Sequence, residues 1–180
     1  MTLLGIARLL DVLEHTSGGA ERDAALRHYA QVTQEELDAT ERLVAALYAN
    51  MADPLLFKRL ALLYFAAASY SEAARRLGKP ELAPGFLLHA HPRFGPELGA
   101  CAELAATGPG FGRDALLARI DRAIEPFDTA GLLDRSRRDW YPVLAEDLLA
   151  NASKLDATLD EVNRLLESCG FVTPAVSRRV

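Results

Sequence analysis

The sequence predicts an all-α fold: a single domain over residues 1–180, built as an irregular multi-helix bundle around a central apolar helix at about 54–77. Leucine and alanine dominate the composition, whereas the β-branched residues that favour strands are sparse. Half of the 180 residues are hydrophobic and a quarter are charged, which suits one globular domain with its own core. Apolar residues recur at helical spacing, and no alternating run indicates a strand.

The first expected helix covers about residues 2–14 and ends at a Ser-Gly-Gly sequence, 17–19. Its apolar face carries Leu3, Ile6, Leu10 and Leu13. Because this amphipathic face begins directly after Met1, we expect the chain to be one part of a larger protein.

A second helical region begins near residue 20 and is expected to break near Val32. Thr33 and Glu36 have the spacing of a capping box, in which each side chain accepts a backbone N–H of the other residue. The helix after this break is expected to bury an apolar stripe against a neighbour. That stripe consists of Leu37, Val44, Tyr48 and Met51, with Glu41 as its odd member and Leu43 and Leu47 beside it.

The central helix has strong signals at both ends. Asp53 followed by Pro54 is typical of a helix N-cap and first turn, and Gly78 follows the last helical residue, Leu77. Residues 60–70 are apolar on every side, so this helix is expected to be surrounded by the others.

The rest of the chain alternates loops and helices. Residues 79–96 form an irregular connection in which 86–88 should lie against the core. We expect helices from Pro92 or Pro96 to about 107, over 113–125 and over 139–153, with a loop at 108–112 and a turn at 128–131. A second capping box, Thr158 and Glu161, should open a final helix that Gly170 ends. That helix is expected to bury Leu159, Val162, Leu165 and Leu166, with Phe171 folded back on its last turn.

Charge and cysteine content exclude several classes of protein. The net charge is −5 and no basic stripe is present, so we expect no nucleic-acid partner. The nearest candidates are Arg135, Arg137, Arg138, Arg178 and Arg179, which we interpret as a solvated turn and a frayed tail. The longest apolar run is too short to span a membrane. Cys101 and Cys169 lie far apart and are expected to be buried, reduced thiols of a cytoplasmic protein.

Residues that could carry chemistry do not form a complete site in the sequence. His89 and His91 could share a face of an extended segment, with Glu97 nearby, but no third metal ligand is evident. The glycine-rich stretch 108–112 lacks the preceding strand that a nucleotide loop needs. Glu72 is expected to pair with Arg75 or Arg76 on its own helix. We therefore assign no catalytic, cofactor-binding or metal-binding residue.

One speculative pocket remains in the central helix. Tyrosines within an apolar helix need partners for their hydroxyl groups. Tyr64, Ser69 and Tyr70 could therefore line a substrate-binding pocket.

Six segments stand out as a set: TLLGIARL (2–9), DPLLFKRL (53–60), LYFAAASYSE (63–72), HPRF (91–94), IEPFDTAGL (124–132) and WYP (140–142). Together they resemble the C-terminal helical region of FAD-dependent oxidoreductases related to the flavin-dependent halogenases. The first segment is similar to the helix that follows the last flavin-contacting segment of such enzymes.

The resemblance implies a non-catalytic cap that packs on a FAD-binding domain and helps to close its substrate side. In that family the dinucleotide fold, its glycine-rich loop, the catalytic lysine and a tryptophan-rich motif all lie upstream, and this sequence contains none of them. The resemblance thus implies no cofactor in this chain, FAD only in a full-length relative, and no enzyme activity of the chain alone.

Two other functions are compatible with the sequence. The chain could be a stand-alone protein-interaction or chaperone-like module that holds a partner helix in an apolar groove. It could also be a helical protein that binds a small molecule near residues 64–70. The expected partners are a FAD-binding domain or a second copy of the chain, because a cap without its partner exposes an apolar face.

Overall fold

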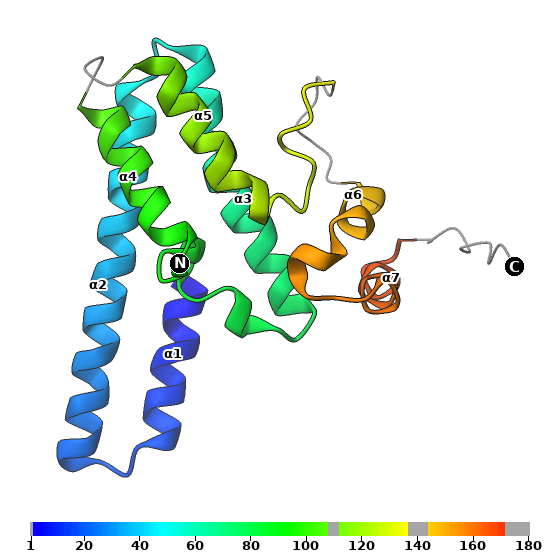
Figure 1. Ribbon diagram of the computed structural model, residues 1–180. Coiled ribbons are helices and arrows are strands. Elements are labelled where there is room, and N and C mark those ends of the chain that lie inside the picture. Colours follow the sequence, from blue (N-terminus) through cyan, green and yellow to red (C-terminus); the bar gives the residue numbers. More distant parts are fainter. Residues whose placement is uncertain (1, 108–111, 137–143, 172–180) are drawn as a thin grey trace, which may run out of the picture.

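The computed structural model describes residues 2–107, 112–136 and 144–171, and this part of the chain is helical without a strand (Figure 1). The all-α prediction is confirmed. The α-helices are α1 (Thr2–His15), α2 (Gly19–Ala49), α3 (Pro54–Arg76), α4 (Phe94–Ala106), α5 (Arg113–Ile124), α6 (Ala145–Ala150) and α7 (Leu159–Ser168). The 3-10 turns are η1 (Pro80–Leu82), η2 (Phe86–Leu88), η3 (Glu125–Phe127) and η4 (Ala152–Leu155).

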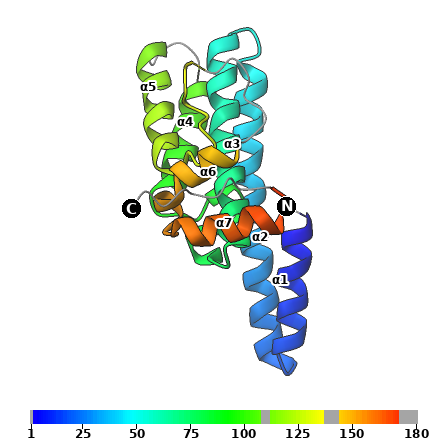
Figure 2. The same cartoon turned by 90° about the vertical axis from the view of Figure 1, so that its right-hand side faces the viewer.

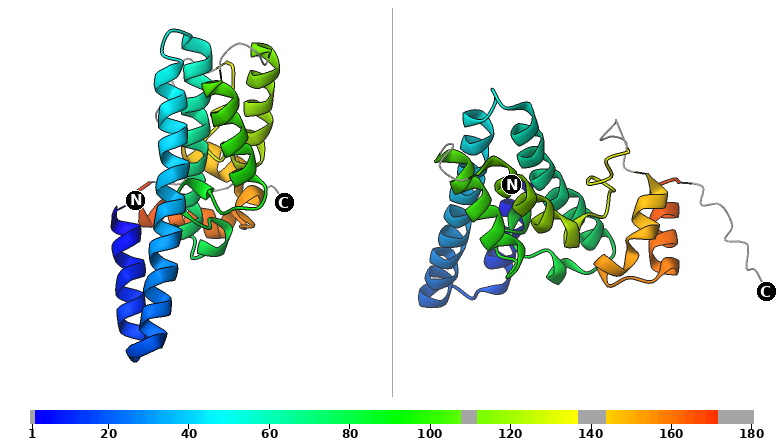
Figure 3. Two further views of the ribbon diagram at one scale, coloured as in Figure 1. Left: turned by 90° about the vertical axis from the view of Figure 1, so that its left-hand side faces the viewer. Right: turned by 45° about the horizontal axis from the view of Figure 1, so that its top comes forward.

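Helices α2, α3, α4 and α5 pack side by side as the body of the bundle (Figure 1). Helix α1 packs chiefly on the N-terminal half of α2, and Figure 2 shows these two segments projecting from the body as a helical hairpin. Helices α6 and α7 pack on each other on the far side of α3 (Figure 3).

Helix α3 is the central helix that the sequence predicts. The Asp53 carboxylate accepts the N–H groups of Leu55 and Leu56, both at 3.1 Å, and thereby caps the helix start. Gly78 ends the helix with a φ of 74°, a conformation that glycine adopts without a steric penalty. Along its middle, Leu60 and Leu63 are completely buried.

Helix α2 is continuous, so the predicted break at Val32 is wrong. The Thr33 hydroxyl donates to the carbonyl of Tyr29 at 2.8 Å, a bond made within a helix, and does not cap a helix start. Glu36 is only 2% exposed and bonds to distant segments. The capping-box spacing at 33–36 therefore has no capping role here.

The predicted buried stripe of α2 is also wrong. Tyr48 is 70% exposed, and the other apolar members of the stripe, Leu37, Val44 and Met51, are exposed too. The buried face of α2 carries Glu36, Leu43 and Ala46 instead. The buried face of α2 thus includes a charged residue, Glu36, and a small one, Ala46, while the large Tyr48 and Met51 face outward.

The irregular segment after α3 contains η1 and η2, and Leu87 and Leu88 lie against the core as predicted. Both leucines have a positive φ, 53° and 57°, which is rare and unfavourable for a branched side chain. Gly85 has a φ of 78°. Helices α4 and α5 confirm the predicted helices that end near 107 and 125.

The C-terminal region differs in part from the prediction. Helix α6 lies within the expected helix 139–153, whereas turn η4 begins in it and continues to Leu155. Trp140, Tyr141 and Pro142 lie outside the described residues. The capping box of Thr158 and Glu161 is confirmed.

The last turn of α7 ends as predicted. The N–H of Phe171 donates to the carbonyl of Leu166 at 3.0 Å, after Gly170 with a φ of 84°. Leu159 is 53% exposed, so its predicted burial is wrong. Of the two thiols, Cys101 is buried as expected, whereas Cys169 is exposed.

Most of loop 108–112, together with Arg137, Arg138, Arg178 and Arg179, falls outside the described residues. Within residues 2–107, 112–136 and 144–171, no helix has both the length and the apolar character that crossing a membrane requires.

Candidate functional site

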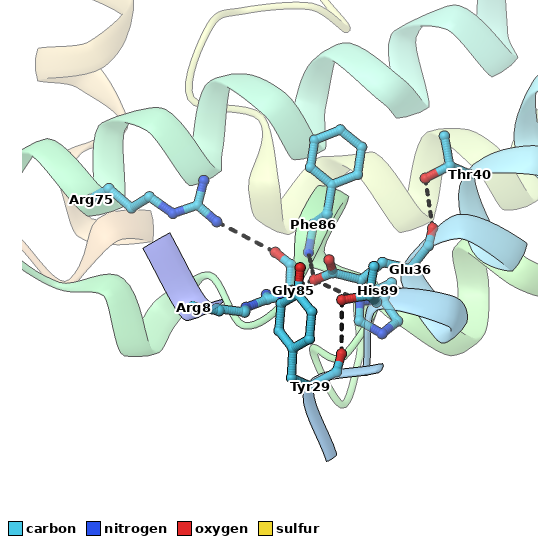
Figure 4. Close-up of polar contacts among 9 residues, drawn as sticks. Arg8, Tyr29, Glu36, Thr40, Arg75, Gly85, Phe86 and His89 are labelled. Atoms are coloured by element: carbon cyan, nitrogen blue, oxygen red, sulfur yellow. Dashed lines mark hydrogen bonds and ion pairs between the residues drawn. The ribbon is translucent and has the colours of Figure 1, made fainter. Parts of the chain in front are cut away.

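A buried carboxylate joins three segments that are distant in the sequence (Figure 4). Oxygen Oε1 of Glu36, on α2, accepts a hydrogen bond from Nη2 of Arg8, on α1, at 2.6 Å. The same oxygen accepts the backbone N–H of Phe86 at 2.7 Å. Nδ1 of His89 lies 3.9 Å from it. We call Arg8, Glu36, Phe86 and His89 the Glu36 cluster.

The backbone conformation of residues 85–89 brings Phe86 and His89 to Glu36. Leu87 and Leu88, both in the left-handed conformation, turn the chain tightly. The backbone N–H of Phe86 and the side chain of His89 therefore both reach the carboxylate of Glu36. A Cβ atom on Gly85 would lie 2.2 Å from Nδ1 of His89, so only glycine fits at this position. Backbone strain of this kind persists where the surrounding structure enforces it.

The cluster keeps Glu36 ionised. Burial raises the pKa of this carboxyl group, but the hydrogen bonds from Arg8 and Phe86 and the nearby charges of Arg8 and His89 lower it more strongly. The net result is a pKa below the usual value for glutamate. An ionised, hydrogen-bonded carboxylate suits the role of an anchor for α1 better than that of a proton donor.

A pocket of about 340 Å³ lies beside the cluster, between α1, α2 and residues 85–90. Its walls include Arg8 and Val12 of α1, Tyr29 and Val32 of α2, and His89. Two buried nitrogen atoms here, Nη1 of Arg8 and Nδ1 of His89, have no hydrogen-bond partner. The cluster thus holds buried polar nitrogen atoms that the described residues leave without a hydrogen bond.

The two neighbouring histidines have different surroundings. Nδ1 of His91 accepts the backbone N–H groups of Arg93 and Phe94, both at 3.2 Å, at the start of α4. Burial, together with the charge of Arg93, lowers the pKa of His91. Glu97 instead pairs with Arg119 at 2.7 Å. Among the described residues no three potential ligands converge on a metal position, and these three side chains do not form a common site.

The face of α1 that points away from α2 is apolar and uncovered. We call this face the outer stripe; it consists of Leu3, Ile6, Leu10 and Leu13. Leu3 is 83% exposed, and the other three are also exposed. Because Arg8 binds Glu36 from the opposite side of α1, the Glu36 cluster fixes the orientation in which the outer stripe meets solvent.

The three residues of the speculative pocket have separate environments. The Tyr70 hydroxyl donates to the carbonyl of Lys154 at 3.0 Å, and its ring is buried. Tyr64 is partly exposed and packs edge-on against Phe65. Ser69 lines a pocket between α3 and α7 to which neither tyrosine contributes. At 100° per residue these three positions point in three directions around α3.

Sequence reasoning missed Glu36, although a signal was present. In an uninterrupted helix, Val32, Glu36, Leu43 and Leu47 lie on one face. A glutamate in the middle of an apolar face indicates a buried charge that needs a partner. The expected break at Val32 concealed this pattern. The partners Arg8 and Phe86 carry no sequence signal that links them to Glu36.

No protein-family model matches the chain, and comparison with curated proteins and with solved structures gives no significant match either.

Proposed function

We propose that this chain is a non-catalytic helical cap that covers the FAD-binding domain of an oxidoreductase, with the outer stripe of α1 as part of the contact. The observation that carries the proposal is an apolar helix face held outward by a buried ion pair on its other side. A helix that is apolar on two sides is typical of one that lies between two bodies.

The identity of the partner rests on the resemblance to FAD-dependent oxidoreductases. The segment that resembles the helix following the flavin-contacting part, 2–9, contains half of the outer stripe, Leu3 and Ile6. These two residues are therefore both exposed in the structure and part of the segment that resembles a helix next to the flavin site. Two unpaired cysteines fit the cytoplasm as the site of such a complex.

The first test is the DNA upstream of the codon for Met1. We expect it to encode a βαβ unit with a glycine-rich dinucleotide-binding loop. An upstream sequence without such a unit would remove the support for a flavin partner.

The second test is binding of the purified chain to that FAD-binding domain, measured by calorimetry. Replacing Ile6 and Leu10 by aspartate should weaken binding by about 100-fold or more, because burying each side chain contributes roughly 1.5–3 kcal/mol. Leu159→Asp is the matched control, since Leu159 is 53% exposed but lies on α7. Equal losses in both variants would reject the outer stripe as the contact.

A further inference from the structure

A second pocket, of about 290 Å³, lies between α3, α6 and α7. Figures 1 and 3 show α6 and α7 on the side of α3 away from the hairpin. We call it the α3–α7 pocket. Its walls are almost wholly apolar and include Ala73 of α3, Leu148 of α6, and Leu165 and Leu166 of α7. Phe171, folded back after α7, also lines the pocket.

The charged groups at the rim of this pocket neutralise each other. Nε of Arg76 pairs with Oε1 of Glu72 at 2.5 Å, and Nη1 of Arg76 contacts Sγ of Cys169 at 3.4 Å. The Ser69 hydroxyl donates to the carbonyl of Phe65 at 2.8 Å. Among the described residues the rim therefore offers no unpaired charge to a ligand, and a charged occupant would lose its hydration without gaining a partner from them.

We propose that the α3–α7 pocket binds an uncharged, apolar small molecule of one or two rings. The size follows from the volume, which is at the small end of the range for ligand pockets. The chemistry follows from the apolar walls and the neutralised rim. The site is independent of the cap function proposed above, because it shares no residue with the outer stripe or with the Glu36 cluster.

Cys169 provides a direct reporter of occupancy. Its thiol is exposed at the edge of the pocket, whereas burial raises the pKa of Cys101 to about 11 and keeps that thiol unreactive. Alkylation by iodoacetamide, followed by mass spectrometry, therefore reports on Cys169 alone.

The experiment measures the alkylation rate with naphthol and with naphthalenesulfonate, its charged counterpart. Naphthol at ten times its dissociation constant should slow alkylation about tenfold, while the sulfonate should have little effect. Ser69→Phe and Ala73→Leu both fill the pocket and should abolish the protection; circular dichroism selects the variant that stays folded. Leu10→Asp, which alters only the outer stripe, should retain the protection.

Three results would overturn this inference. The first is an alkylation rate that naphthol does not change. The second is equal protection by the sulfonate, which would reject selection for an uncharged molecule. The third is protection that rises with protein concentration in the absence of naphthol, which would show that a second copy of the chain fills the pocket.

Discussion

One oxygen atom of Glu36 receives a side chain from 28 residues earlier in the chain and a backbone N–H from 50 residues later. A buried carboxylate is unfavourable unless such donors surround it. The positions of α1 and of residues 85–89 on α2 therefore depend on the same group.

We predict that Glu36→Gln lowers the free energy of unfolding by about 2–3 kcal/mol, since it removes the charge that pairs with the half-buried Arg8. Urea denaturation measures this change. The control is Glu97→Gln, which removes the more exposed ion pair with Arg119 and should cost less than about 1 kcal/mol. Equal losses in the two variants would contradict the anchoring role of Glu36.

Stability should also depend on pH through Glu36. Because the folded-state pKa is lower than the ordinary glutamate pKa of about 4.5, the stabilisation is fully present above about pH 4.5. It is lost as the pH falls through the folded-state pKa. Asp53, bound by Arg113, and Glu161, bound by Thr158, also have lowered pKa values.

Protonation of Asp53 and Glu161 changes the stability of wild type and of Glu36→Gln equally. The difference between the pH curves of the two proteins therefore reports on Glu36. We expect the wild type to lose more stability than the variant between pH 5 and pH 3, measured by urea denaturation at each pH. Parallel curves of stability against pH would show that Glu36 does not contribute to the pH dependence.

At the scale of elements, helix ends were predictable because their signals are local. Asp53 with Pro54, and Thr158 with Glu161, cap their helices as the sequence indicates. The same local rule failed at Thr33, because a capping-box spacing also occurs inside helices and only the flanking pattern distinguishes the two cases.

The burial of α2 could not be predicted from side-chain size. Tyr48 and Met51 are large but exposed, while Ala46 is small and completely buried against its neighbours. Helix α4 packs closely along α2, and a close approach between helices favours a small residue at the contact. The tertiary fold determines which face of α2 packs against α4.

Residues 85–89 allow a test of the strained turn. Gly85→Ala and Gly78→Ala both place alanine at a positive φ, 78° and 74°, and both should cost about 1–2 kcal/mol for this reason. At Gly85 the new methyl group also meets His89, whereas Gly78 has open space around it. We therefore expect Gly85→Ala to cost a further ~1–3 kcal/mol in thermal or urea unfolding. Equal effects would mean that His89 moves freely.

For the whole molecule, the projecting hairpin of α1 and α2 leaves the outer stripe uncovered (Figure 2). We predict that the isolated chain associates with itself through this face, since exposed contiguous apolar surface favours association. Sedimentation velocity should show a mass that increases with concentration. Leu10→Asp should shift the chain toward monomer, and Leu159→Asp should not.

A monomer at all concentrations would contradict the predicted self-association.

The fold class was predictable because composition and helical spacing are averaged over the entire chain. The candidate site was not, because it arises where Arg8, Glu36 and Phe86 meet, and only the packing of α1 and η2 on α2 brings them together. The outer stripe was predictable in part. Its residues were evident from their spacing, but its exposure follows from the projecting hairpin.

The most direct test of the cap function is hydrogen exchange of the chain with and without the FAD-binding domain. If the outer stripe is the contact, amides of α1 exchange more slowly in the complex, while amides of α7 keep their rates. Unchanged exchange in α1, with protection confined to other helices, would show that α1 is not the docking face.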